Sequence, residues 1–305
     1  MLLQTPVELP PRSPQLSPQS SVLLLGSCFA AHIGERLSVA LNAEAPAPLR
    51  CASNPFGVLY NPRSICQALR LLMMPQAEMQ QHIEASLFRG RDGGWHSWLF
   101  STLFSATSRE ETLLRTMQSA TSARSLLSNP DLCIILTFGT DHHYALAARH
   151  GCIVANCHKE HPDTFIEQTD TVAALQALLV ATLQEMAEHF PHARFILTVS
   201  PYRYRKYGFH TSMVGKARLL LMCEAAQTAL PQCVSYFPAY EILNDELRDY
   251  RFYQPDMLHP SAQAVDYIAA RFEEWCFLPA LTALAAERRK AMRSAKHREI
   301  LQPSE

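Results

Sequence analysis

The stretch SVLLLGSCFA (21–30) carries an apolar run directly into a Gly-Ser-Cys turn and the start of a helical pattern. Continuous apolarity is typical of a strand that is buried on both faces, as in a parallel sheet. Similar apolar runs recur along the chain, with helical patterns between them. Strands that alternate with helices predict an α/β fold: a three-layer α/β/α sandwich around a mainly parallel sheet, with right-handed crossovers.

These patterns also place the individual elements. The predicted strands cover 21–27, 131–140, 194–201 and 233–240, with a shorter fifth strand at 151–157. The predicted helices cover 28–41, 62–73, 108–127, 171–189, 215–229 and 261–275. Ser108 and Glu111 have the spacing of a capping box at the start of the third helix. Two short aromatic-rich runs joined by RDGG predict an inserted hairpin near 86–105, a candidate wall or lid over a site.

The chain of 305 residues divides into three predicted parts. Five prolines with Ser and Gln predict an extended N-terminal arm over 1–20. We expect one α/β domain over 21–275. A helical tail is expected over 276–305, with its basic side facing solvent rather than binding a partner.

Composition narrows the classes of function. The chain is 48% hydrophobic and 18% charged, so it can bury a large core. Its net charge of -1 argues against nucleic acid as a partner, because such binding needs a concentrated basic surface. No signal-like segment occurs, and no apolar run approaches the roughly 18 residues that cross a bilayer, which predicts a cytoplasmic protein without a membrane span. Nine scattered cysteines predict free thiols rather than disulfides.

Two short motifs have residue types that could carry chemistry. Ser27 follows a predicted strand and precedes a helix, so we expect its hydroxyl at the sheet edge beside the positive helix end. The Cys28 thiol, one residue further on, is expected to pack away from the site. In DMLH, Asp256 can fix the tautomer of His259 and leave the other ring nitrogen to take a proton. A helix N-cap network is the alternative interpretation of this pair.

Other motifs are missing or weak. The chain has no G-x-S-x-G elbow, no phosphate-binding P loop and no G-x-G-x-x-G, which excludes the classical α/β-hydrolase, P-loop and dinucleotide-binding classes. A zinc site is disfavoured, because its candidate ligands lack the paired short gaps of structural zinc sites. Those candidates are Cys152, Cys157, His158 and His161, with His142 and His143 upstream.

Six separated blocks occur in order: GSCFA (26–30), SNPFGVLYNP (53–62), TFGT (137–140), NCHK (156–159), TVSPYR (198–203) and YFPAYEILNDELRDYRFYQPDMLHPS (236–261). With them the chain resembles the GSCFA family from about 21 to 275, a family that looks like a branch of the SGNH/GDSL hydrolase superfamily. The resemblance implies a serine esterase or O-acyltransferase without cofactor or metal. Its substrate would be a small-molecule or glycan acyl ester, carbohydrate O-acetyl groups among the candidates. Ser27 would be the nucleophile, and Asp256 and His259 the rest of the triad.

The resemblance also implies an oxyanion hole, with N–H groups of Ser27 and Gly57 as donors. An Asn is expected in the third block, but Asp141 stands there, and an anionic carboxylate cannot donate to an oxyanion. We expect Asn156 to replace that Asn. Further substrate-lining candidates are Asn54, Gly139, Thr140, His142, His158, Ser200 and Arg203, together with Tyr202 and Arg251. Ion pairs with Asp245, Glu246 or Asp249 are the alternative for the arginines.

Two other functions stay open. The missing Asn favours a catalytically silent module that binds a glycan or acyl group on the same scaffold. A third possibility uses Cys28 as the nucleophile in place of Ser27.

Overall fold

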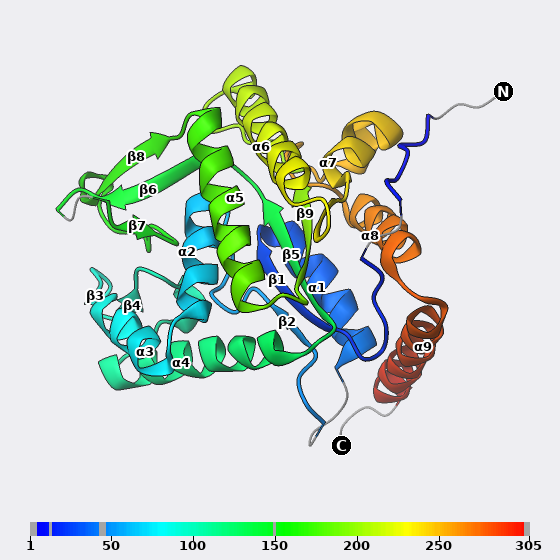
Figure 1. Cartoon of the computed structure of the whole chain (residues 1–305), viewed down its shortest axis with the longest axis horizontal. Helices are drawn as coiled ribbons and strands as arrows, with labels where there is room; N and C mark the ends of the chain where they lie inside the picture. Colours follow the sequence, from blue (N-terminus) through cyan, green and yellow to red (C-terminus); the bar gives the residue numbers. More distant parts are fainter. Residues whose placement is uncertain (1–4, 12–13, 43–46, 149–150, 302–305) are drawn as a thin grey trace.

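Five parallel strands form the central sheet, in the order β10-β9-β5-β1-β2 (Figure 1). The computed structural model describes residues 5–11, 14–42, 47–148 and 151–301, with side chains up to 294, so parts of the predicted arm and tail lie outside the described residues. The strands are β1 (Ser21–Gly26), β2 (Cys51–Ser53), β5 (Leu132–Phe138), β9 (Arg194–Val199) and β10 (Val234–Tyr236). Because β1 pairs with both β2 and β5, the strand order reverses beside it. Open α/β sheets bind ligands at such a switch point.

The turn that follows β1 depends on a close approach between two strands. A Cβ atom on Gly26 would lie 2.3 Å from the carbonyl oxygen of Thr137 on β5, and the φ of Gly26 is +151°. The N–H of Ser27 donates to the same carbonyl at 3.2 Å. Glycine at position 26 therefore lets the end of β1 lie against β5 and fixes where Ser27 begins.

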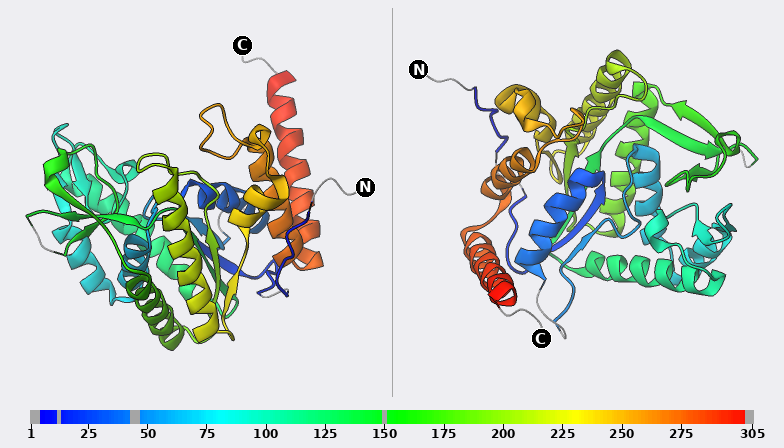
Figure 2. Two further views of the ribbon diagram at one scale, coloured as in Figure 1. Left: turned by 90° about the horizontal axis from the view of Figure 1, so that it is seen from above. Right: turned by 180° about the vertical axis from the view of Figure 1, so that it is seen from behind.

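Helices cover both faces of the sheet, and each face has its own hydrophobic cluster. Leu23 and Ile134 pack on one face, and Leu24 and Ile135 on the other, as expected from the alternation of side chains along a strand. The first face is covered by α2 (Pro62–Met73), α4 (Arg109–Ser125), α5 (Val172–His189) and α6 (Phe209–Ala229). The second is covered by α1 (Cys28–Leu41), α8 (Ala262–Cys276) and the start of α9 (Pro279–Leu301), seen from behind in Figure 2. The predicted three-layer sandwich is confirmed.

Local sequence signals placed several helix starts well. The Ser108 hydroxyl accepts the N–H of Glu111 at 3.1 Å, which confirms the predicted start of α4. Helical segments that were not predicted include α3 (Gln76–Ala85), α7 (Ala239–Glu241) and a π-helical stretch (Ile242–Leu247). The strand expected over 233–240 is correspondingly shorter. The strand ends before residue 240 because Pro238 has no N–H to continue the sheet, and the chain turns there into α7.

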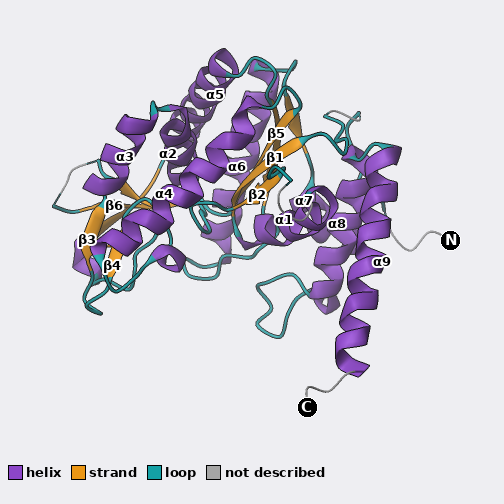
Figure 3. Cartoon of the chain, turned by 90° about the horizontal axis from the view of Figure 1, so that it is seen from below, coloured by secondary structure: helices purple, strands orange, loops and turns teal. Residues whose placement is uncertain are grey.

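Two separate insertions carry smaller sheets at the end of the molecule away from α9 (Figure 3): one lies between β2 and β5 in the chain, and the other between β5 and β9. The predicted hairpin is confirmed, with β3 (Leu87–Arg89) antiparallel to β4 (Trp95–Ser97). The second sheet has the order β7-β6-β8, from β6 (His142–Leu146), β7 (Ile153–Val154) and β8 (Phe165–Thr169). The fifth strand expected at 151–157 in the central sheet is therefore wrong: β7 pairs antiparallel with β6, and β2 takes its place.

The N-terminal segment packs along α8 and the start of α9. Leu16 is fully buried; its N–H donates to Cys276 at 2.6 Å, and its carbonyl accepts from Leu278 at 2.9 Å. The Trp275 indole donates to the carbonyl of Pro10 at 2.9 Å. Within the described ranges, no disulfide joins any cysteines, and no helix has the length and apolarity needed to cross a membrane.

Candidate active site

A cavity of about 180 Å³ lies at the switch point between β1 and β5. Its lining residues come from the ends of β1, β5 and β9 and from the loops before α2 and α8. They are Ser27, Cys28, Tyr60, Gly139, Ser200, Tyr202, Tyr204 and His259. A volume of this size has room for about six water molecules, so it suits a small chemical group rather than a long chain.

Ser27 is the N-cap residue of α1, with extended backbone and no capping hydrogen bond from its side chain. The residue is 1% exposed, and its hydroxyl has no hydrogen-bond partner among the described residues. We expected this hydroxyl to be accessible at the sheet edge; instead Ser27 lines the cavity with its hydroxyl covered. A buried hydroxyl without a partner is rare in folded proteins and calls for an explanation.

His259 and Asp256 form the predicted pair. His259 Nδ1 lies 2.5 Å from Asp256 Oδ2, while Asp256 Oδ1 accepts the N–H groups of Leu258 and His259 at 2.9 and 3.0 Å. The carboxylate fixes the ring orientation and leaves Nε2 available to act as a base. The N-cap of α8 is Ser261, which accepts the N–H of Ala264 at 3.2 Å, so the pair does not cap the helix, although Asp256 does satisfy two backbone N–H groups of the turn before it.

We expect the carboxyl group of Asp256 to titrate near pH 2. Its hydrogen bond with His259, and then its backbone N–H bonds, lower the pKa of Asp256 from 3.8 to about 2. Because this pKa is lower in the folded state, the pair stabilises the fold above the ordinary pKa, and that stabilisation is lost as the pH falls toward 2. Carbon NMR of the isotope-labelled Asp256 carboxyl group, followed as a function of pH, measures this pKa. In His259→Ala the pKa should return toward its ordinary value, and an unchanged titration would show that the imidazole is not the cause.

The loop after β9 holds this pair in place. The Tyr202 ring lies 4.5 Å from the ring of His259, centroid to centroid. The backbone N–H of Arg203 donates to Leu258 at 3.0 Å, and its guanidinium donates to the carbonyl of Met257 at 3.2 Å. Arg203 was predicted to line the substrate pocket, but its guanidinium packs over the ring of Phe209 at 4.6 Å. Its contacts therefore support the position of His259. The other arginine candidate, Arg251, pairs with Asp249 at 3.0 Å.

The three expected oxyanion donors do not converge. The Ser27 N–H donates to Thr137, and the Gly57 N–H donates to the carbonyl of Asn54 at 2.7 Å. The Asn156 side-chain oxygen accepts the N–H of His158 at 3.0 Å. Neither Gly57 nor Asn156 lines the cavity. This arrangement corrects the assignment taken from the family resemblance: local turns engage both backbone donors, and Asn156 belongs to the loop after β7.

Other backbone donors lie beside the cavity. The N–H groups of Cys28 and Phe29 open α1; they make no hydrogen bond to a backbone carbonyl of the described residues, and both lie beside the Cys28 thiol. Orphan N–H groups and the positive end of a helix favour negative charge. The first turn of α1 is therefore the best local environment for an oxyanion.

Three of the predicted lining residues, Gly139, Ser200 and Tyr202, do line the cavity. Thr140 lies just outside it and donates its N–H to the carbonyl of Tyr60 at 3.0 Å. Asn54 accepts the N–H of Gly26 at 2.9 Å and so supports the end of β1. Thr140 and Asn54 are thus structural neighbours of the cavity rather than parts of its wall.

The histidine candidates lie elsewhere. His142 stacks on Tyr207, with ring centroids 3.7 Å apart. His158 is buried against Trp98 and His96, and burial lowers its pKa to about 4. Among the described residues, no three His, Cys, Asp or Glu side chains converge in a way that could hold a metal ion.

Cys28 differs from its expected position. Its thiol was predicted to pack away from the site, yet Cys28 is half-buried and lines the same cavity as Ser27. Burial raises the pKa of the Cys28 thiol, partly offset by the N–H groups of Phe29 and of Cys28 itself. A protonated thiol is a weak nucleophile, so the geometry alone does not make Cys28 the reactive group.

Sequence reasoning missed two aromatic walls of the cavity. Tyr60 accepts the N–H groups of Gly139 and Thr140 through its carbonyl, at 2.8 and 3.0 Å. Tyr204 is largely buried, and burial raises its pKa to about 12. The sequence could have indicated both residues, because Tyr60 lies in the block SNPFGVLYNP and Tyr204 directly follows the block TVSPYR.

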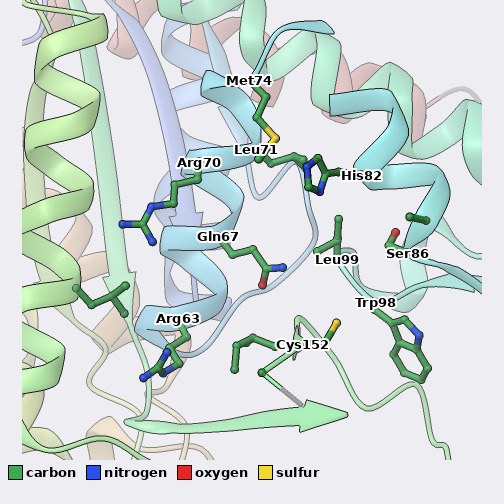
Figure 4. A pocket seen from close by; sticks show the side chains of 14 residues that line it. Arg63, Gln67, Arg70, Leu71, Met74, His82, Ser86, Trp98, Leu99 and Cys152 are labelled. Atoms are coloured by element: carbon green, nitrogen blue, oxygen red, sulfur yellow. The ribbon is translucent and has the colours of Figure 1, made fainter. Parts of the chain in front are cut away.

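A larger cavity of about 420 Å³ lies between α2, α3 and the segment after β4 (Figure 4). Its walls are mainly apolar, and its two arginines are already paired. Arg63 donates to Asp170 at 2.7 and 2.6 Å, and Arg70 to Glu185 at 2.9 and 3.1 Å. The 86–105 insertion lines this cavity, through Trp98 among others, and not the one beside Ser27, so its predicted role as a wall over the site is corrected.

Comparison with known proteins adds the family. The model of the GSCFA family matches residues 21–272. The chain belongs to the GSCFA family. A solved structure from Streptococcus pneumonia, described provisionally as a platelet activating factor, is 13% identical to this GSCFA chain, with a TM-score of 0.38 and 83% of each chain covered. A search of curated proteins finds no match.

Proposed function

We propose that this GSCFA-family protein is a serine esterase or O-acyltransferase of SGNH type, with Ser27, His259 and Asp256 as its triad. The proposal depends on one observation: Ser27 and His259, from opposite ends of the family-matched region, line one small cavity at the switch point of the sheet. The bond from Asp256 to Nδ1 leaves Nε2 as the proton acceptor.

The reaction would proceed in two halves. His259 Nε2 takes the proton of the Ser27 hydroxyl while the serine oxygen attacks the acyl carbonyl carbon. As the tetrahedral intermediate collapses, the imidazolium returns that proton to the leaving alcohol, and an acyl ester remains on Ser27. Water or an acceptor hydroxyl then gives its proton to His259 and takes the acyl group, and His259 returns that proton to the Ser27 oxygen, which restores the serine and the neutral imidazole. Asp256 stabilises the imidazolium in both halves.

The intermediate would place its negative oxygen at the start of α1. The N–H groups of Cys28 and Phe29 are the donors we assign to it, because no backbone carbonyl of the described residues accepts from them. Each oxyanion donor of this kind is worth on the order of 100-fold in turnover.

The covered hydroxyl of Ser27 is compatible with this chemistry. Since it makes no hydrogen bond to any described residue, it can rotate toward the cavity without breaking one. The rotation exchanges one staggered position for another. An unsatisfied hydroxyl is thus poised to gain a partner when the imidazole and an ester approach.

The cavity favours a short acyl group. Its volume of about 180 Å³ excludes a long fatty chain, and Tyr60, Tyr202 and Tyr204 line it. Such walls contact apolar acyl carbons while their hydroxyl groups remain available to polar substituents. We therefore propose acetyl and similar esters as substrates, with the alcohol portion extending from the cavity.

A catalytically silent binding module is the second candidate. It is favoured by the covered hydroxyl of Ser27 and by the engagement of Gly57 and Asn156 in other hydrogen bonds. Such a module would bind an acyl or glycan group in the cavity without forming an acyl-enzyme. Covalent labelling separates the two candidates.

We expect a fluorophosphonate probe to modify Ser27 covalently in the wild-type protein, because the probe mimics the tetrahedral intermediate of a serine hydrolase. Peptide mass spectrometry locates the label. Ser27→Ala should abolish labelling, whereas Cys28→Ala, a matched change one residue away, should keep the label on Ser27. Labelling on Cys28 would assign the nucleophile to the thiol. Equal labelling of wild type and Ser27→Ala would remove the main support for a serine enzyme.

A further inference from the structure

Lys216, on α6, is a buried cation that adjoins the cavity without lining it. The residue is 4% exposed. Its Nζ donates to the carbonyl oxygen of Gly139 at 2.6 Å and to that of Ser200 at 2.8 Å. Gly139 and Ser200 directly follow β5 and β9, and both line the cavity. One side chain therefore joins the ends of two neighbouring strands at the site.

The charge of Lys216 is not matched by a close carboxylate. Among the described residues, none forms an ion pair with Lys216, and the nearby Asp141 pairs with Arg218 at 2.6 Å. Burial lowers the pKa of Lys216 to about 7, while the charges of Asp141 and Cys28 oppose this shift. Burying an amine without an ion pair destabilises the fold. Stability alone therefore does not explain why a lysine occupies this position.

The hydrogen bonds of Lys216 belong to a wider network around the cavity. The carbonyl of Tyr60 accepts the N–H groups of both Gly139 and Thr140. Lys216 then fixes Gly139 from its carbonyl side and Ser200 from the neighbouring strand. The cavity walls at Tyr60, Gly139 and Ser200 are therefore connected: the Tyr60 carbonyl binds Gly139, and the Lys216 ammonium group joins Gly139 to Ser200.

The close approach of α6 is built into the sequence. A Cβ atom on Gly215 would lie 2.5 Å from Oδ1 of Asp141. Glycine there lets the helix carry Lys216 against the end of β5. Lys216 also interacts electrostatically with Cys28: each group shifts the pKa of the other. The ammonium group of Lys216 therefore acts on the first turn of α1.

We propose that Lys216 is a positioning residue for acyl transfer: it clamps the ends of β5 and β9 to shape the cavity wall, and in its protonated form it supplies positive charge near the helix end where the oxyanion forms. This inference rests on the proposed esterase or acyltransferase function. Lys216 does not line the cavity, so it acts through Gly139, Ser200 and the local potential rather than by touching the substrate.

Kinetics of Lys216→Met test this role, because methionine keeps the length of the side chain and removes both its charge and its donors. With an aryl acetate as substrate, we expect kcat to fall about 10- to 100-fold and KM to change less than about threefold. A displaced cavity wall would misalign the reacting groups but largely keep substrate binding. Lys216→Arg, which keeps charge and donors, should recover part of kcat. Lys206→Met, the matched change at an exposed lysine paired with Glu167, should behave as wild type.

Hydrogen exchange provides a readout that does not depend on turnover. Peptides covering 138–142 and 199–204 should exchange about tenfold faster in Lys216→Met than in wild type, and should not change in Lys206→Met. If Lys216→Met does not fold, Lys216→Gln replaces it. Unchanged exchange or an unchanged kcat would overturn the proposal. If the wild type turns over no ester, the proposed function fails, while the exchange data still decide whether the clamp exists.

Discussion

Replacement of His259 by alanine is expected to lower kcat for an aryl acetate by about 10³-fold or more. The imidazole of His259 is the only histidine ring among the described residues that line the cavity, and its Nδ1 is already engaged by Asp256. Without it, the proton of Ser27 has no acceptor in the attack and the leaving alcohol has no donor. KM should change only a fewfold, because proton transfer occurs in the transition state rather than in binding.

His210→Ala is the matched control for this experiment. His210 is exposed near the start of α6 and does not line the cavity, so its removal should leave both kcat and KM unchanged. Asp256→Asn should fall between wild type and His259→Ala in kcat, since the ring would remain but in the wrong tautomer. A His259→Ala protein that keeps most of its turnover would contradict a base at this position. A loss confined to KM would reassign His259 to substrate binding.

Replacement of Gly26 by alanine should destabilise the fold by about 3 kcal/mol or more, the largest effect we expect from one methyl group. The added Cβ would meet a backbone carbonyl at 2.3 Å, and β1 could avoid it only by moving away from β5. These two strands run side by side through six paired positions in the middle of the sheet. Urea unfolding followed by circular dichroism measures the change as a lower midpoint.

Gly93→Ala separates the contact from backbone strain. Gly93, in the β3–β4 hairpin turn, has a φ of +80° and nothing within 4 Å of the position a Cβ would take. Its replacement should therefore cost about 1 kcal/mol, from conformational strain alone. If both variants lost the same stability, contact with Thr137 would not be the reason why position 26 requires glycine.

The parts of the fold that were predictable carry their signal in local sequence. The strands β1, β5 and β9 are buried almost throughout, and their continuous apolar runs predicted them. The strand β2 reads CAS and has one buried residue, so only its pairing with β1 makes it a strand. The run at 151–157 is apolar because it packs against the 86–105 insertion: Val154 joins a hydrophobic cluster with Trp98 of that insertion and with Leu146. Apolarity shows that a segment is buried but not which sheet it joins.

The site divides in the same way. The spacing of Asp256 and His259 fixes a local turn, so their hydrogen bond could be predicted without a structure. The oxyanion donors could not, because hydrogen bonds to Thr137 and Asn54 commit the N–H groups of Ser27 and Gly57. Lys216 carried no visible signal. Its contacts are with backbone carbonyls, whose positions depend on tertiary packing and not on residue type.

The central position of β1 has a consequence for biosynthesis. This strand is followed closely by β2, but β5 on its other side is synthesised roughly a hundred residues after β1, about 5 to 20 seconds later at typical rates of translation. During that interval the largely apolar strand β1 (SVLLLG) has no native neighbour on its β5 side, and such edges template incorrect association. Slow codons between positions 27 and 131 would prolong this exposure, whereas faster elongation or a holding chaperone would shorten or shield it.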